Sequence, residues 1–179
     1  MPSAVEIFKE TRNLENVISE HNDIVMQYKK DFTRYETEDR KPYLTKIYDL
    51  IPAELNNSNK RFNFADLKKG LQYSRSEDNF IWLANAGVAL PVYNVAAPAI
   101  PLLLNAKSSL FKLFLSDVGM LTTLYGRATK KQLLSDDQDI NNGALYENVV
   151  AQELKVHGFK LYYYNSKKFG ELDFVIEYK

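Results

Sequence analysis

The pattern of apolar residues between positions 143 and 177 constrains the fold of this chain more than any other feature. Residues 143–154 have the apolar spacing of a helix. Residues 159–164 and 171–177 follow as two runs rich in aromatic and β-branched residues, which are typical of strands. The sequence therefore predicts a helix followed by two strands. Because the sequence stops at Lys179 with no turn signal, we expect this element to be truncated.

Composition limits the class of protein. A chain of 179 residues has room for one domain or two small ones, and a hydrophobic content of 45% with 13% aromatic residues supports a packed core. The formal net charge is zero, so any basic site must be local. The chain has no cysteine, which excludes disulfides and thiolate metal sites and suits a cytoplasmic protein. Three prolines interrupt the longest apolar stretch, residues 86–104, so we expect no membrane partner.

The first 40 residues predict a helical lead-in. Apolar residues in 3–36 form three successive helical faces. Asn13 is the expected N-cap of the second helix, and Asn22 or Asp23 that of a third. Residues 33–41 are charged and lack apolar periodicity, which indicates a linker.

Residues 41–126 predict a winged-helix domain, in which three helices precede a two-stranded ribbon. A helix begins at Pro42 and is bent or ended by Pro52, and a short helix spans 65–71 with Asp66 as its cap. The third helix, 76–86, stands in the recognition position and ends at Gly87, with Ser74 or Ser76 as its cap. Residues 92–95 and 110–115 are the expected strands.

A further helix, capped by Asp117 and stopped by Gly126, precedes a polar stretch at 127–142 that indicates a surface loop. The expected fold class is therefore α+β and mostly helical. It comprises the helical lead-in (1–40), the winged helix (41–126) and a truncated α/β element (127–179).

Acidic residues in the last element suggest a metal site. Metal-dependent nucleases hold a divalent cation between carboxylates with a lysine nearby, and Glu147 on the helix converges with Asp173 if the helix packs on the sheet. The spacing Glu177-x-Lys179 resembles the last part of such a site. However, Asp173 and Glu177 are four residues apart on one strand, or roughly 13 Å at about 3.3 Å per residue. This distance is too long for both carboxylates to bind the same ion. The alternative, that Glu147 faces solvent and Glu171, Asp173 and Glu177 are ordinary strand charges, stays open.

Other patterns carry weaker signals. Residues 137–141 imitate the start of a calcium-binding loop, but the glycine and the closing glutamate are out of register. A basic cluster has the composition of a DNA-phosphate contact or of a solvated face; its members are Lys60, Arg61, Lys68, Lys69 and Arg75. Trp82 is expected in the core.

His21 is isolated in the sequence, and His157 is expected to cap a helix C-terminus. The chain has no P-loop and no nucleophile elbow motif.

Several of these segments resemble the C-terminal region of a group of prokaryotic AAA-type ATPases. The most specific part is GALYENVVAQEL at 143–154 with YYY at 162–164 and ELDFVI at 171–176. The stretches DVGML at 117–121, MPSAV at 1–5, and RFNF at 61–64 leading to KG at 69–70 are also similar. In that family a P-loop ATPase domain is followed by a winged helix and then by a domain similar to PD-(D/E)XK (restriction-endonuclease-like) nucleases.

The resemblance implies a role for each part. Glu147 and Asp173 correspond to the helix and strand carboxylates of the nuclease-like core. The E-x-K strand would lie beyond Lys179 and the ATPase domain before Met1. ATP and magnesium would then be cofactors of the parent protein, and we expect no cofactor or metal in this chain.

The leading hypothesis is a non-catalytic fragment, not itself an enzyme, that couples ATP hydrolysis elsewhere in the parent to DNA or a protein partner. One alternative is a magnesium-dependent nuclease that uses Glu147 and Asp173. Another is a winged-helix DNA-binding module. A homodimer through the exposed C-terminal strand is a further expectation, because an unpaired strand edge invites pairing.

Overall fold

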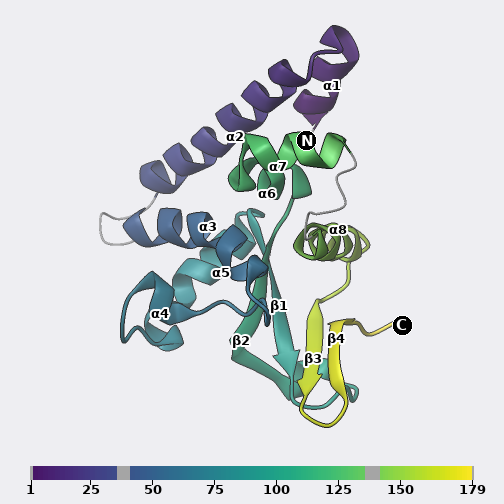
Figure 1. The fold of residues 1–179 in the computed structure, drawn as a ribbon. Coiled ribbons are helices and arrows are strands. Elements are labelled where there is room, and N and C mark those ends of the chain that lie inside the picture. Colours follow the sequence, from purple (N-terminus) through teal and green to yellow (C-terminus); the bar gives the residue numbers. More distant parts are fainter. Residues whose placement is uncertain (1, 36–40, 136–141, 179) are drawn as a thin grey trace.

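The computed structural model of the chain describes residues 2–35, 41–135 and 142–178. Helices predominate, and a single four-stranded mixed sheet lies beside them (Figure 1). The predicted fold class, α+β and mostly helical, is confirmed. No helix in the described ranges is both long and apolar enough to cross a membrane.

The elements follow the chain in a simple order. The helices are α1 (Pro2–Thr11), α2 (Leu14–Tyr35), α3 (Lys41–Asn56), α4 (Phe64–Leu67), α5 (Glu77–Asn85), α6 (Val118–Tyr125), α7 (Arg127–Leu134) and α8 (Gly143–Val156). The strands are β1 (Ala89–Val95), β2 (Ala106–Leu115), β3 (Tyr162–Ser166) and β4 (Gly170–Val175). Two 3₁₀ turns, η1 (Tyr73–Arg75) and η2 (Leu102–Asn105), precede α5 and β2.

The N-terminal segment is a helical hairpin. Asn13 begins α2 as predicted, because its side-chain oxygen accepts a hydrogen bond from the Glu15 amide at 2.9 Å. The predicted break at Asn22 or Asp23 is wrong, since α2 continues through both residues to Tyr35. Apolar residues that follow them, such as Val25 and Phe32, pack into the core, and this packing outweighs the weak helix propensity of Asn and Asp. Residues 36–40 of the predicted linker lie outside the described ranges.

The middle helices differ from the prediction in detail. Pro52 does not end α3, which runs to Asn56 because Ile51 and Leu55, on either side of the proline, are both fully buried. The short helix α4 ends at Leu67 rather than at residue 71. Its cap is Asn63, whose side-chain oxygen accepts from the Ala65 amide at 3.1 Å, and not Asp66. The amide Nδ2 of Asn63 donates to Asp66 at 2.9 Å, so Asp66 supports the cap from inside the helix.

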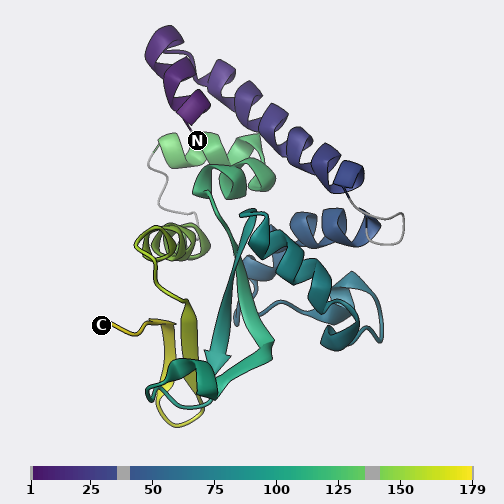
Figure 2. The same cartoon turned by 180° about the vertical axis from the view of Figure 1, so that it is seen from behind.

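The sheet has the strand order β2-β1-β3-β4. The β1–β2 and β3–β4 pairs are antiparallel, and β1 pairs with β3 in parallel. Figures 1 and 2 show α3, α4 and α5 on one side of the β1–β2 hairpin and α8 on the other. The predicted division at residues 126 and 127 stays a prediction, but the sheet itself continues from one part to the next through the β1–β3 pair.

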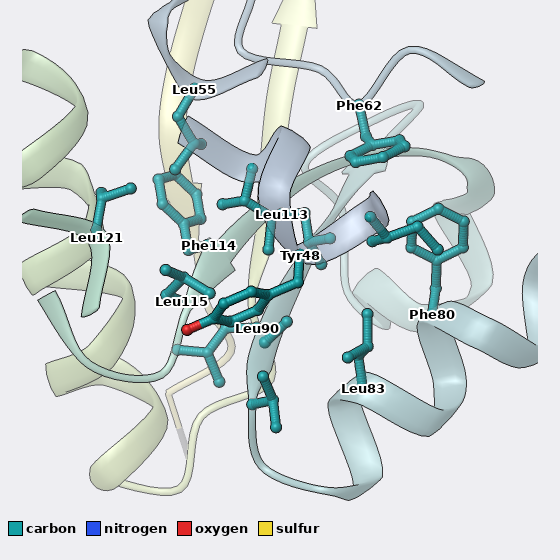
Figure 3. Close-up of a cluster of buried hydrophobic side chains, with 14 of the residues drawn as sticks. Tyr48, Leu55, Phe62, Phe80, Leu83, Leu90, Leu113, Phe114, Leu115 and Leu121 are labelled. Carbon is teal, nitrogen blue, oxygen red and sulfur yellow. The ribbon is translucent and has the colours of Figure 1, made fainter. Parts of the chain in front are cut away.

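An aromatic cluster forms the core between the sheet and helices α3 to α5. Phe80 lies 5.0 Å from both Phe62 and Phe111, measured between ring centroids. Trp82 is partly buried and meets Phe32 edge-on at 5.7 Å, in agreement with its predicted place in the core. Figure 3 shows Tyr48 at the centre of the neighbouring aliphatic side chains. Its hydroxyl donates to the sulfur of Met120 at 3.7 Å.

The segment after β2 differs from the prediction at one place. Asp117 caps α6 as expected, accepting from the Gly119 amide at 2.7 Å, and Gly126 ends the helix with a positive φ of 98°. The predicted surface loop at 127–142 is wrong for its first half, which forms α7. This helix forms because Leu133 packs against the core and Lys130 is only 8% exposed. One side of α7 is therefore buried, although its sequence is mostly polar.

The C-terminal strands are shorter than predicted. Strand β3 begins at Tyr162, and β4 ends at Val175 rather than continuing to residue 177. Glu177 turns away to accept a hydrogen bond from the Leu102 amide. In the described part of the chain, β4 is the last strand of the sheet on its side.

Candidate functional site

The ammonium group of Lys112 lies among three carboxylates. The distances from its Nζ are 2.7 Å to Glu171 Oε1, 2.9 Å to Asp173 Oδ1 and 3.4 Å to Glu147 Oε2. The Lys112 side chain is only 1% exposed, whereas that of Asp173 is 52% exposed. The carboxylates therefore connect a buried cation to the surface. We call these four residues the Lys112 cluster.

Strand alternation positions the members of this cluster. Phe111 belongs to the aromatic core, so its neighbour Lys112 points to the opposite face of the sheet. Glu171 and Asp173 are two residues apart on β4, which places both side chains on one face. Glu147 lies in the second turn of α8, which packs on β1 and β2. Strands β2 and β4 and helix α8 thus bring the side chains of the Lys112 cluster together.

A second lysine approaches from the segment before α4. The Phe62 amide donates to the Phe111 carbonyl at 3.0 Å, which holds this segment along the outer edge of β2. Lys60 extends from there to form an ion pair with Glu147 Oε1. The guanidinium of Arg61 lies 5.9 Å from the centroid of the Tyr163 ring, and Lys112 Nζ lies 5.3 Å from the same centroid. The cluster and its neighbours therefore carry three negative and three positive charges.

The protonation of Lys112 follows from these contacts. Burial lowers the pKa of the Lys112 ammonium group, but hydrogen bonds to Glu171 and Asp173 and the charge of Glu147 hold that pKa above its usual value. Lys112 therefore stays charged at neutral pH. Burial also raises the pKa of Tyr163, whose hydroxyl has no hydrogen-bond partner among the described residues.

The arrangement does not fit a divalent cation. Carboxylate oxygens suit magnesium at about 2.1 Å. In the cluster, however, these oxygens surround the Lys112 ammonium group, which fills the space that such an ion would take. Among residues 2–35, 41–135 and 142–178, no group of three His, Cys, Asp or Glu side chains is arranged to hold a metal.

Sequence reasoning found part of this site. It anticipated that Glu147 and Asp173 converge, and the structure brings both to Lys112. Glu147 does not face solvent, since its side chain is 13% exposed and pairs with two lysines. Lys112 itself was missed. The available signal was its position as the one charged residue in the apolar run 110–115.

The predicted basic cluster separates into two groups. Lys60 and Arg61 lie beside the Lys112 cluster. Lys68, Lys69 and Arg75 instead line a polar pocket of about 280 Å³ at the start of α5, together with Asn79. The side-chain oxygen of Asn79 is buried there without a hydrogen-bond partner in the described part of the chain.

The other candidates have mainly structural roles. His157 caps α8 as predicted, because its Nδ1 donates to the Glu153 carbonyl at 2.8 Å. His21 is not isolated in space, since its Nδ1 lies 3.0 Å from Lys130 Nζ. Burial and the Lys130 charge lower the pKa of His21. Lys179 and residues 137–141, which imitate the start of a calcium loop, lie outside the described residues.

Comparison with known families divides the chain into two matched regions. Residues 1–131 match the model of a domain of unknown function, DUF8612. The chain belongs to this family. Residues 142–179 match a second domain of unknown function, DUF4143. No curated protein and no solved structure matches the chain.

The Lys112 cluster joins these two regions. Lys112 lies in the DUF8612 region, and Glu147, Glu171 and Asp173 all lie in the DUF4143 region. The parallel β1–β3 pair makes the same connection through the backbone. The second match is compatible with the resemblance to AAA-type ATPases.

Proposed function

We propose that this DUF8612 chain is a non-catalytic module of a prokaryotic AAA-type ATPase. Its role is to couple nucleotide hydrolysis, performed elsewhere in the parent, to DNA or to a protein partner. The DUF4143 match supports the link to such ATPases. The order α3-α4-α5-β1-β2 supports a winged helix within the module, and the α8–β3–β4 unit supports a nuclease-like element.

The single observation that carries the non-catalytic part is the position of Lys112. Glu147 and Asp173 are the carboxylates that a nuclease of this kind would need for its cation. Both instead form ion pairs with one buried ammonium group whose pKa is raised. The cluster therefore acts as an ionic connection between the two matched regions, through which a movement of one region is passed to the other.

Two assays on the purified chain test this proposal. Supercoiled and linear DNA are incubated with the chain in magnesium and in manganese, and we expect no cleavage above that of Glu147→Ala. ATP is then titrated calorimetrically, and we expect no micromolar binding, because the chain has no P-loop. Cleavage that disappears in Glu147→Ala, or micromolar ATP affinity, would contradict the proposal.

The nuclease alternative is favoured by one observation, the convergence of Glu147 and Asp173 beside a lysine. The same cleavage assay, repeated with the variant Lys112→Met, tests the nuclease alternative. A nuclease that uses Lys112 to steady the attacking water loses activity in this variant. An inactive wild-type chain removes the alternative.

A DNA-binding role is favoured by a different observation. Lys68, Lys69 and Arg75 line one polar pocket and form no ion pair in the described part of the chain. Contacts from these side chains to phosphates make affinity fall steeply with salt. Binding of a fluorescent DNA duplex is measured from 50 to 300 mM salt for the wild type, for Lys68→Ala/Lys69→Ala and for the control Lys167→Ala/Lys168→Ala. Binding that is absent, independent of salt or unchanged in the pocket variant removes this role.

A further inference from the structure

A second and larger cavity is lined by residues of β1, of the segment before β3 and of the ends of α5 and α8. Its volume is about 490 Å³, within the range of roughly 300–1,000 Å³ that small-molecule sites occupy. Tyr93 lines it, and the Tyr93 ring packs 5.8 Å from that of Phe111. Since Phe111 and Lys112 point to opposite faces of β2, Tyr93 lies on the face opposite to Lys112, and none of the four residues of the Lys112 cluster lines the cavity.

Both matched regions build this cavity. The DUF8612 region supplies the end of α5, the start of β1 and the start of β2, including Ala84, Leu90 and Ala106. The DUF4143 region supplies Leu161 and Tyr162 at the start of β3. Ligand sites occur preferentially where two such parts meet. A molecule bound here would contact both regions at once.

The walls are mainly apolar, and the charges at the cavity have a single sign. Lys155 near the end of α8 and Lys160 before β3 both line the cavity and are exposed. Neither forms an ion pair with a described residue, and no Asp or Glu is among the lining residues. An occupant that matches this site has an apolar body for the walls and a negative group for the two lysines.

We propose that this cavity binds a small amphiphilic carboxylate, an aliphatic chain or aromatic ring that carries one carboxyl group. The apolar part displaces water from Tyr93 and Leu103, and the carboxylate lies between Lys155 and Lys160. Apolar burial supplies most of the affinity, while the lysines select an anion over a cation. The proposal is independent of the proposed coupling function, because it requires neither an ATPase nor DNA.

A small molecule fits this cavity better than a protein segment does. The volume of about 490 Å³ matches a small ligand, and both matched regions supply the walls. The exposed apolar residue Leu103 lines the cavity, and the exposed Ile100 and Leu104 lie on either side of it in the sequence. A peptide that bound here would need to cover all three. The test below therefore includes a peptide whose binding would count against a small ligand.

The test is calorimetric titration of the full chain with laurate, with dodecylamine as the cationic counterpart of equal apolar length. A capped tetrapeptide of two leucines between two glutamates is titrated in parallel. We expect one laurate per chain, and dodecylamine binding at least about fivefold weaker. We expect no saturable binding of the peptide.

Three variants locate the site. Lys155→Gln/Lys160→Gln weakens laurate binding about fivefold or more, whereas the matched control Lys167→Gln/Lys168→Gln leaves it unchanged. Ala84→Trp fills the cavity and abolishes binding. Because a large side chain can also disturb folding, Ala106→Leu is a second filling variant, and a thermal melt checks each protein.

Three results would overturn the proposal. The first is the absence of saturable laurate binding to the wild-type chain. The second is equal affinity for laurate and dodecylamine, or equal laurate affinity in the wild type and in folded filling variants. The third is saturable binding of the peptide to the wild-type chain. None of these results bears on the ATP and cleavage assays, so this proposal and the coupling function can fail separately.

Discussion

Lys112 is the residue whose position decides the chemistry of this chain. A buried ammonium group is tolerated only when carboxylates compensate for its lost hydration, and here three of them do so. The same pairing, together with the charges of Lys60 and Arg61 beside it, offsets the negative charge that would attract a metal to Glu147 and Asp173. One side chain thus accounts for both the joining of the two matched regions and the poor fit to a divalent cation.

Replacing Lys112 tests the strength of this pairing. Lys112→Met leaves Glu147, Glu171 and Asp173 close together without a buried cation, and we expect a loss of about 3–5 kcal/mol in unfolding free energy at pH 7. Urea unfolding followed by circular dichroism measures it. The control Lys107→Met removes an exposed lysine from the same strand and should change stability by less than about 0.5 kcal/mol. Equal stability of the two variants would refute the prediction.

Glu54 gives the chain a pH dependence of its own. This residue is 2% exposed, and burial raises the pKa of its carboxyl group to about 7, although the Asn63 amide donates to it at 3.2 Å. The native state therefore holds this proton more tightly than the unfolded state, whose value is 4.5. This contribution to stability is complete below pH 4.5, declines as the pH rises towards 7 and is absent above it.

The variant Glu54→Gln isolates this effect, because an amide stays neutral at every pH. Relative to the wild type, the variant should become more stable by about 2–3 kcal/mol between pH 5 and pH 8. Chemical unfolding at several pH values measures the difference, with the exposed Glu153→Gln as control. A difference that does not change with pH would show that Glu54 ionises in the fold as it does in water.

Some of these residue roles could be predicted from the sequence and others could not. The caps Asn13 and Asp117 were predictable because a cap depends on neighbours within three residues. The convergence of Glu147 and Asp173 was also inferred, from their element types. The pairing of Lys112 with Glu171 was not, because it depends on the order of strands, which no local pattern contains.

At the scale of elements, helix α8 is fastened to the end of β2 by one buried side chain. Asn148 is fully buried, and its side-chain oxygen accepts from the Leu115 amide at 2.9 Å. Its Nδ2 donates to the Leu115 carbonyl at 3.0 Å. The side-chain amide of Asn148 thus bonds the Leu115 backbone as a neighbouring strand would. In addition, the Gln152 side-chain oxygen accepts a hydrogen bond from the Val118 amide at 3.1 Å.

Removing this side chain should loosen α8. Asn148→Ala leaves both backbone groups of Leu115 buried without partners, and we expect a loss of about 2–4 kcal/mol in unfolding free energy. Hydrogen exchange of the Leu115 amide should accelerate in parallel. The control Tyr146→Ala truncates an exposed residue of the same helix and should change little. Unchanged exchange at Leu115 would contradict the assigned contact.

Elements with a strong apolar period were predicted well, and the polar ones were not. The helix at 143–154 appears as α8 with bounds close to those expected. Helix α7 was missed because its sequence is mostly polar, and its burial depends on contact of Lys130 with His21 on α2. The continuation of α3 past Pro52 likewise reflects tertiary packing, which overrides a local helix breaker.

At the scale of the molecule, the two matched regions share one sheet. Strand β3 of the DUF4143 region pairs with β1 of the DUF8612 region, and Lys112 adds ion pairs beside this junction. A segment as short as residues 142–179 cannot bury a core of its own. Each region therefore depends on the other for a complete sheet.

Separate expression of the regions tests this dependence. We expect residues 142–179 to be unfolded alone by circular dichroism, and residues 1–135 to melt at a lower temperature than the whole chain because β1 loses its partner β3. Mixing the two pieces should restore part of the lost stability. A folded 142–179 piece, or an unchanged melting temperature for 1–135, would indicate two independent units.

Manganese titration of the wild-type chain, followed by electron paramagnetic resonance, tests the central claim most directly. Because Lys112 occupies the space between Glu147, Glu171 and Asp173, the account predicts that free manganese persists in proportion to the amount added, with no stoichiometric site at concentrations up to about 1 mM. One tightly bound manganese ion per chain, lost in Glu147→Gln and retained in the control Glu153→Gln, would contradict it.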